Sequence, residues 1–288
     1  MISLREACLN YIAGVSSRPV INQANQAPSA APTADLVTVL AKNVAGFISA
    51  AMTTTGDCVN YDGLRESKVF AQYREEFLIP LRIFDPRSIS SPKTATAFWI
   101  NLYNALVLDA VIAFDVRDSL VKGKLDMMTF FRRAAYEIGG QHITLDDIEH
   151  GILRGNRGSP FIPGPHFRSD DPRFSWVLPL DSRIHFTLNC GGRSCPPFRA
   201  YEAGKLHQQL NLAAGSFIDG TVEVHPETNQ LVLSQIFRWY AADFGGREGI
   251  IRLLLDYLPD GKRRRYLHSE SDDYDLVFTP YDWQLNAI

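Results

Sequence analysis

One long apolar run, residues 93–114, constrains the fold more than any other part of this 288-residue chain. It reads KTATAFWINLYNALVLDAVIAF and places apolar residues on nearly every side of a helix, which predicts a buried helix. Ser91 and Pro92 form a good helix start, because proline is tolerated in the first turn. Asn101 and Asn104 interrupt the run, and a buried amide must find hydrogen-bond partners. These amides either tie neighbouring loops to the helix or orient a catalytic group from inside the core.

Residues with possible chemistry concentrate in the stretch DSRIHFTLNCGGRSCPP, from Asp181 to Pro197. Residues 183–189 alternate between polar and apolar, the period of a half-buried strand. The run stops at Gly191 and Gly192, where the backbone can take conformations that a side chain forbids. A strand followed by a glycine loop and a helix often places reactive groups on a rigid frame.

The remaining patterns predict short elements around the long helix. Helices are expected at residues 145–154 and 202–218, hairpins at 136–144 and 221–233, and a strand near 277–280. The sequence therefore predicts an α+β fold that is mainly helical, with a small antiparallel sheet of hairpins packed on a buried central helix.

Composition divides the chain into two parts. Residues 1–60 are expected to form a helical N-terminal extension, with a flexible linker around 14–33 that is rich in Ser, Asn, Gln, Ala and Pro. Residues 61–288 are expected to form the main domain.

Charge and hydropathy set the expected partners and location. A net charge of -3 gives no electrostatic reason to expect nucleic acid as a partner. No secretory signal is recognised at the start, and no stretch is expected to reach the ~20 apolar residues of a transmembrane segment. Four cysteines do not make a disulfide framework in a chain of this length. A cytoplasmic protein is the expectation.

The first chemical hypothesis is a thiol nucleophile with a histidine base. Cys195 or Cys190 would attack, activated by His150 or His185. In an extended strand, His185 and Cys190 would lie about 16 Å apart, so Cys195 would have to fold back across the glycine turn. Asn101 or Asn189 would orient the catalytic group. The backbone amides of Gly191, Gly192 and Arg193 would form an oxyanion hole.

Three alternatives stay open at this point. His150, His185, Cys190 and Cys195 are ligand types suited to zinc, although Cys-x4-Cys is wider than the usual structural spacing. The same two cysteines could form a reversible disulfide, without the Cys-x-x-Cys spacing of thioredoxins. They could also be inert packing residues in a binding or scaffold module.

Three blocks of this sequence resemble one known family. AFWINLYNALVLDAVI (97–112), ITLDDIEHGILR (143–154) and DSRIHFTLNCGGRSCPP (181–197) are similar to the central blocks of domain of unknown function 547, and LSQIFRWYAADFG (233–245) and YDWQLN to its C-terminal signature. The resemblance covers roughly residues 61–287. It implies a domain carried alone in many proteins and fused to other modules in plants, with no settled activity. The polar residues inside these motifs are Asn101, Asn104, Glu149, His150, Arg154, Arg183, His185, Asn189, Cys190, Ser194 and Cys195.

A buried helix against a small sheet is also similar to papain- and transglutaminase-like folds. In transglutaminase-like enzymes the nucleophilic cysteine starts that helix, whereas this chain has no cysteine there, only Asn101. The resemblance therefore transfers no mechanism directly.

The sequence thus favours a cysteine/histidine-dependent hydrolase or acyltransferase, with a non-catalytic module using the same pocket as the alternative. The expected ligand is a small molecule or a peptide, anionic or carbonyl-bearing because several Arg and His side chains are candidates for one cleft. No metal and no cofactor are predicted. The expected substrate-binding residues are Asn104, Glu149, Arg154, Arg183, Gly191, Gly192, Arg193 and Ser194.

Overall fold

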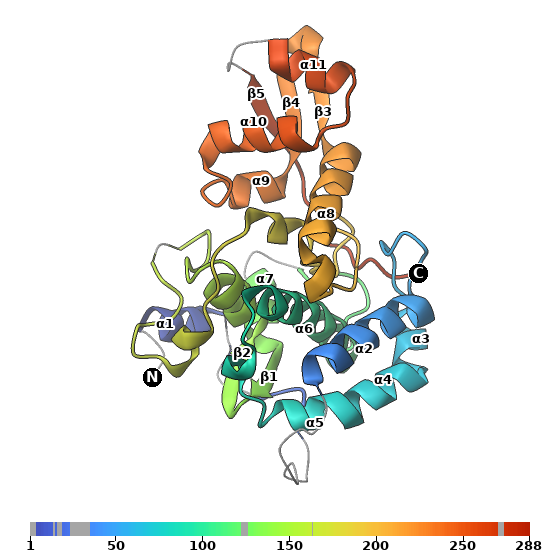
Figure 1. Cartoon of the computed structure of the whole chain (residues 1–288), viewed down its shortest axis with the longest axis vertical. Helices are drawn as coiled ribbons and strands as arrows, with labels where there is room; N and C mark the ends of the chain where they lie inside the picture. The colour runs from blue at the N-terminus through green and yellow to red at the C-terminus, as the bar shows by residue number, and fades with distance from the viewer. Residues whose placement is uncertain are drawn as a thin grey trace.

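The fold is α+β and mainly helical, as predicted (Figure 1). The computed structural model describes residues 4–13, 15, 19–23, 35–121, 126–162, 164–269 and 274–288. The α-helices are α1 (Leu4–Ile12), α2 (Leu36–Ala51), α3 (Tyr61–Glu66), α4 (Lys68–Gln72), α5 (Leu78–Leu81), α6 (Pro92–Ala113), α7 (Asp126–Arg133), α8 (Leu206–Thr221), α9 (Gln235–Trp239), α10 (Gly246–Tyr257) and α11 (Lys262–Ser269).

Short 3-10 and π-helices and five strands complete the described part of the chain. The 3-10 helices are η2 (Pro86–Ser88), η4 (Pro172–Trp176), η5 (Ser182–Phe186), η6 (Ala203–Lys205) and η7 (Pro226–Thr228), and the π-helices are η1 (Tyr73–Phe77) and η3 (Asp147–Leu153). The strands are β1 (Ala135–Ile138), β2 (Gln141–Thr144), β3 (Glu223–His225), β4 (Gln230–Ser234) and β5 (Asp275–Thr279).

The central helix α6 is the buried helix that the apolar run predicts. Its side chains from residue 97 to 112 are all buried, because α2, η3, β1 and other elements surround it. By length and composition α6 could cross a membrane: an 18-residue window has a mean hydropathy of 1.4, and 94% of that window is buried inside the protein. The sequence reading expected no such stretch. The burial fits a core helix.

A second hydrophobic core lies apart from the one around α6. It is built by α8, α9, α10 and the three-stranded sheet β3-β4-β5, which occupy the upper part of Figure 1. Both predicted hairpins are present, β1 with β2 and β3 with β4, and both are antiparallel. Strand β5 instead pairs parallel with β4, so this sheet is mixed. Of the two hairpins, it is β1–β2 whose contact with α6 is established, through β1.

The predicted strand at residues 183–189 is wrong. The chain forms the 3-10 helix η5, because Asp181 accepts a hydrogen bond from the Arg183 amide and the Thr187 hydroxyl donates to the Ile184 carbonyl at 2.7 Å. Such local side-chain bonds compete with strand pairing. Every residue from Ile184 to Gly192 is buried, so the alternation does not mark two faces.

The proposed division at residue 60 stays a prediction. Helix α2 contributes Leu40, Val44 and Phe47 to the same core as α6. Most of the predicted linker at 14–33 lies outside the described residues.

Candidate functional site

A cavity of about 90 Å³ lies where η3, the cysteine loop (residues 189–197), α9 and the C-terminal segment (residues 281–286) meet. Its polar lining comprises Arg132, Asp146, Glu149, His150, His185 and Cys190. Its aromatic lining comprises Tyr103, Phe161, Trp239, Tyr240, Tyr281 and Trp283. Ligand sites are usually lined by aromatic and apolar side chains with a small number of convergent polar groups, and this lining has that character.

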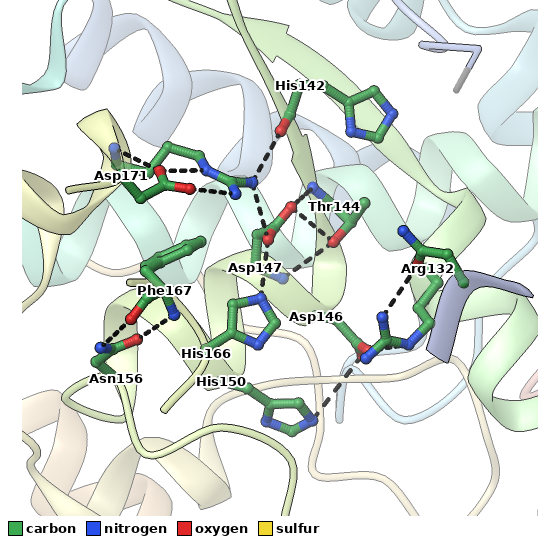
Figure 2. Close-up of polar contacts among 12 residues, drawn as sticks. Arg132, His142, Thr144, Asp146, Asp147, His150, Asn156, His166, Phe167 and Asp171 are labelled. Carbon is green, nitrogen blue, oxygen red and sulfur yellow. Dashed lines mark hydrogen bonds and ion pairs between the residues drawn. The ribbon is translucent and has the colours of Figure 1, made fainter. Parts of the chain in front are cut away.

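The π-helix η3 carries Glu149 and His150, and Asp146, which directly precedes η3, also lines the cavity. Asp147 fixes its start: the carboxylate accepts bonds from the Thr144 amide and hydroxyl, both at 2.9 Å, from Arg173 at 3.1 Å, and contacts His166 at 2.8 Å. Figure 2 shows Asp147 between Thr144 and His166; Asp146 directly precedes Asp147 in the chain, and His150 follows three residues later. π-helical turns are rare in proteins overall, but those that do occur frequently lie at functional sites.

The partners of Asp147 keep its buried carboxyl group ionised. Burial by itself would raise the pKa of this carboxyl, but Arg173 and His166 outweigh burial and hold the pKa well below its usual range. The ion pair between Arg173 and Asp147 is buried, and it fixes the first residue of η3.

Glu149 points its carboxylate at two phenols. Tyr103 donates to Oε2 at 3.1 Å and Tyr240 donates to Oε1. Burial, together with the Glu149 charge, raises the pKa of both tyrosines well above the ordinary value, so both keep their protons.

The ring of His150 is oriented by a hydrogen bond from Arg154. The Arg154 Nη1 lies 3.1 Å from Nδ1 of the ring, and because a guanidinium can only donate, Nδ1 accepts and Nε2 carries the proton. Burial is the largest cause that lowers the pKa of His150 well below its ordinary value, and the positive charge of Arg154 is the next largest. The neutral ring therefore presents an N–H toward Asp146, whose Oδ1 is 3.9 Å away.

His185 is oriented by Asp243, a residue that the sequence reading did not select. Its Nε2 lies 2.9 Å from Asp243 Oδ2, and its ring stacks on Tyr240 with centroids 3.9 Å apart. Burial lowers the pKa of His185, although the hydrogen bond that the ring donates to Asp243 acts in the opposite direction. Arg154 Nε also donates to Asp243, at 2.6 Å, so one carboxylate links the two histidine positions.

Burial would raise the pKa of Asp243, but the hydrogen bonds from His185 and Arg154 outweigh it, and the pKa is held well below its usual range. The residue is therefore an anion that fixes the ring orientation of His185.

The two central cysteines form a disulfide, Cys190–Cys195, so neither is a free thiol in this structure. Cys190 lines the cavity together with His185, since the chain coils through η5 and does not extend over the predicted 16 Å. The Tyr281 hydroxyl lies 3.3 Å from Cys190 Sγ and 3.1 Å from Cys195 Sγ. Disulfide sulfurs carry no hydrogen, so this hydroxyl is the donor.

The side chains of the three predicted asparagines form hydrogen bonds with backbone groups. Asn101 bonds the carbonyl and amide of Tyr201, at 2.8 and 2.9 Å. Asn104 bonds the Thr187 carbonyl and the Asn189 amide, at 3.0 and 2.9 Å. Asn189 in turn spans the cysteine loop, from the Gly191 amide to the Pro196 carbonyl. Their amides are therefore occupied by loop anchoring, the first of the two readings of Asn101 and Asn104.

The predicted oxyanion hole is wrong for two of its amides. The Gly191 amide donates to Asn189 Oδ1 at 2.7 Å, and the Arg193 amide donates to the Gln284 carbonyl at 2.9 Å. The first bond lies within the loop itself, and the second is made by the C-terminal segment that packs against the loop.

Of the eight predicted binding residues Glu149 lines the cavity, and seven are absent from its lining: Asn104, Arg154, Arg183, Gly191, Gly192, Arg193 and Ser194. Gly192 pairs with Leu285 in an isolated bridge, and the Arg193 guanidinium donates to Gln284 Oε1 at 2.6 Å. The Ser194 hydroxyl accepts from the Asp282 amide. Arg183 pairs with Asp181 and reaches Asn211 on α8.

A metal site finds no support in the described ranges, where no group of three or more His, Cys, Asp or Glu side chains could hold an ion. The zinc alternative also requires free thiols at Cys190 and Cys195, which are bonded to one another.

The sequence reading also missed the aromatic wall. Trp239, Tyr281 and Trp283 contact one another, with ring centroids 4.6 to 5.8 Å apart. A signal existed: Trp239, Asp243, Tyr281 and Trp283 all fall in the two C-terminal blocks quoted above. They contribute no nucleophile or base on their own, and so gave no local reason to select them.

Comparison with known proteins gives one result. Residues 86–218 match the model of a family described as "Protein of unknown function, DUF547". This segment contains α6, η3 and the cysteine loop, so the resemblance is confirmed there. No curated protein and no solved structure matched the chain.

Proposed function

We propose that this chain, whose residues 86–218 form a DUF547 domain, is a thiol-dependent hydrolase or acyltransferase that acts through Cys190 after the Cys190–Cys195 disulfide is reduced. The observation that carries the proposal is the His185–Asp243 pair, 2.9 Å apart, in the wall of the cavity that Cys190 also lines. A nucleophile beside a base that a third group orients is the general arrangement of such enzymes.

His185 is the base in this proposal. Its Nε2–H is directed to the Asp243 carboxylate, which leaves Nδ1 with a lone pair. Because burial lowers its pKa, the ring is neutral near pH 7 and can accept the Cys190 proton.

Two donors assist the reaction in place of backbone amides. The Nε2–H of His150 is fixed by Arg154 and is available to the oxygen of a bound carbonyl. The Tyr281 hydroxyl, beside both sulfurs, can donate to a thiolate at Cys190. Burial and the Glu149 charge raise the pKa of Tyr281 well above its ordinary value, so it remains a donor.

The chemical steps follow from these positions. A dithiol reductant converts the disulfide to two thiols and is itself oxidised. His185 takes the Cys190 proton, the sulfur bonds to the substrate carbonyl carbon, and the leaving group departs with the proton from His185. Water or a second nucleophile then breaks the thioester and restores the Cys190 thiol.

The test uses two single substitutions that differ only in which thiol is freed. Cys195→Ser leaves Cys190 as a thiol without any reductant, and Cys190→Ser leaves Cys195. We expect Cys195→Ser to be alkylated by iodoacetamide at residue 190 faster than at Cys8, a free and exposed cysteine in the same chain, and to hydrolyse p-nitrophenyl acetate.

Cys190→Ser should do neither, and His185→Gln in the Cys195→Ser background should remove the rate advantage. An alkylation rate at residue 190 no higher than at Cys8 would contradict the proposal. Fast alkylation without ester hydrolysis would instead favour a second function, thiol–disulfide exchange, for which the observed disulfide is the specific reason.

A further inference from the structure

We propose that the cavity binds the protonated primary amino end of a larger ligand, with Glu149 as its counter-ion. The inference rests on the proposed function, in which this amine is the second nucleophile and attacks the Cys190 thioester. The C–N bond forms and the C–S bond breaks. The nitrogen sheds two protons, one through His185 to the departing sulfur and one through Glu149 to water.

The charges that face the cavity leave one carboxylate without a cation. Arg132 and Asp146 pair with each other, with Nε and Oδ2 3.2 Å apart. His150 Nδ1 lies 3.7 Å from Glu149 Oε1, but this nitrogen accepts from Arg154 and so carries no proton. Burial lowers the pKa of His150 and of His185, so neither ring supplies a cation. Glu149 remains, and an anion in a partly buried site favours a cationic ligand.

Cations behind the wall do not cancel this charge. Arg154 lies under the Tyr240 ring and is neutralised by Asp243 at 2.6 Å. Arg157 also contacts Asp243, but its side chain is 48% exposed and therefore screened by solvent.

Glu149 has room for a further donor. Its two bonds from Tyr103 and Tyr240 come from neutral phenols, one to each oxygen. An ionised carboxylate offers about four acceptor positions, so an ammonium N–H can still be accepted. The phenols hold the carboxylate in one orientation toward the cavity.

The aromatic wall suits the same ligand. Trp239, Tyr281 and Trp283 line the cavity, and aromatic rings attract a cation and pack against the methylene groups that carry it. The cavity of about 90 Å³ is smaller than the ~150 Å³ space that holds benzene, so it admits an end group only. Phe161 also lines the cavity and is 54% exposed, which places the rest of the ligand outside it, against this residue.

This ligand differs from the anionic one that the sequence suggested. That expectation placed Arg183 and Arg193 in the cleft, and neither lines the cavity. Arg154, the third arginine, is bonded to Asp243.

The experiment measures binding to the oxidised protein, without reductant, so that no thiol is free at residue 190. Three probes of one size differ in charge: n-butylamine, n-butanol and butyrate. Their affinities are measured at pH 7 by saturation-transfer NMR and by the indole resonances of Trp239 and Trp283. We expect butylammonium to bind at least about 10-fold more tightly than butanol, as a charge-assisted bond implies, and butyrate to bind most weakly.

The matched variants are Glu149→Gln and Glu248→Gln, the latter on the exposed face of α10. Glu149→Gln should remove the preference for butylammonium over butanol, and Glu248→Gln should retain it. 1,4-Diaminobutane and a blocked Gly-Lys-Gly peptide separate two sources of the amine: the tighter binder identifies the source, and either supports the inference.

Wild-type binding of butyrate as tight as that of butylammonium would overturn the inference, whether or not the variants fold. A Glu149-dependent preference for the ammonium would support it even where Cys190 proves unreactive. The two proposals therefore fail separately.

Discussion

Replacing Asp243 by asparagine removes the charge that holds three side chains at the back of the cavity. The carboxylate contacts Arg154 Nε at 2.6 Å, His185 Nε2 at 2.9 Å and Arg157 Nη1 at 3.0 Å. The side chains of Arg154 and Asp243 are 4% and 1% exposed, so the substitution leaves a buried cation uncompensated, at a cost of about 3–5 kcal/mol. The half-exposed Arg157 adds less than about 1 kcal/mol.

We expect Asp243→Asn to lower the free energy of unfolding by about 3–5 kcal/mol in urea at pH 7. Tm should fall by roughly 2–4 °C for each kcal/mol. The asparagine amide can also donate to His185 Nε2, which moves the ring proton to Nδ1, so Cys190 alkylation in the Cys195→Ser background should slow as well.

The matched control is Asp170→Asn, which makes the same chemical change in an exposed pair. Asp170 and Arg168 are 63% and 60% exposed, so the loss should be far smaller than for Asp243→Asn. Equal losses for Asp170→Asn and Asp243→Asn would refute the reasoning about burial.

Two further predictions concern the histidines and η3. Burial lowers the folded-state pKa of His150 and His185 below the unfolded value of about 6.5, so their contribution to stability is complete above pH 6.5 and is lost as the pH falls, by up to about 1.4 kcal/mol per pH unit for each ring. The free energy of unfolding, measured from pH 7.5 to 5, should show this slope. His150→Gln should reduce the slope, whereas His268→Gln, at an exposed position, should leave it unchanged. Equal slopes for wild type and His150→Gln would contradict the prediction. A Cβ at Gly151 would lie 2.4 Å from Phe167, so Gly151→Ala should destabilise by about 1–3 kcal/mol, whereas Gly220→Ala on α8, where a Cβ meets nothing within 4 Å, should be neutral or stabilising. A stable Gly151→Ala in chemical denaturation would show that Phe167 yields freely.

Patterns of local spacing were sufficient for much of the fold. The apolar run predicted α6, and the paired glycines predicted the turn between β1 and β2. Four of the predicted site residues, Glu149, His150, His185 and Cys190, do line one cavity. Periodicity carries such information because burial of a helix face depends on near neighbours.

Other features depend on contacts that no local pattern encodes. The bond of His185 to Asp243 spans 58 residues and that of Cys190 to Tyr281 spans 91. The strand reading of 183–189 failed because Asp181 and Thr187 satisfy the backbone locally. Whether Cys190 and Cys195 are bonded depends on how the loop folds, since their spacing allows a thiol, a metal ligand or a disulfide.

The C-terminal wall also sets the order in which the cavity can be completed as the chain leaves the ribosome. Cys190 and Cys195 lie 5 residues apart and can meet as soon as their own loop has emerged. Tyr281, Trp283 and the bridge from Gly192 to Leu285 arrive some 90 residues later. In a nascent chain the two cysteines are therefore accessible to oxidants and reductants until Tyr281, Trp283 and Leu285 have been synthesised and cover them. The oxidation state of the pair can thus be decided during synthesis, before the cavity exists to protect it.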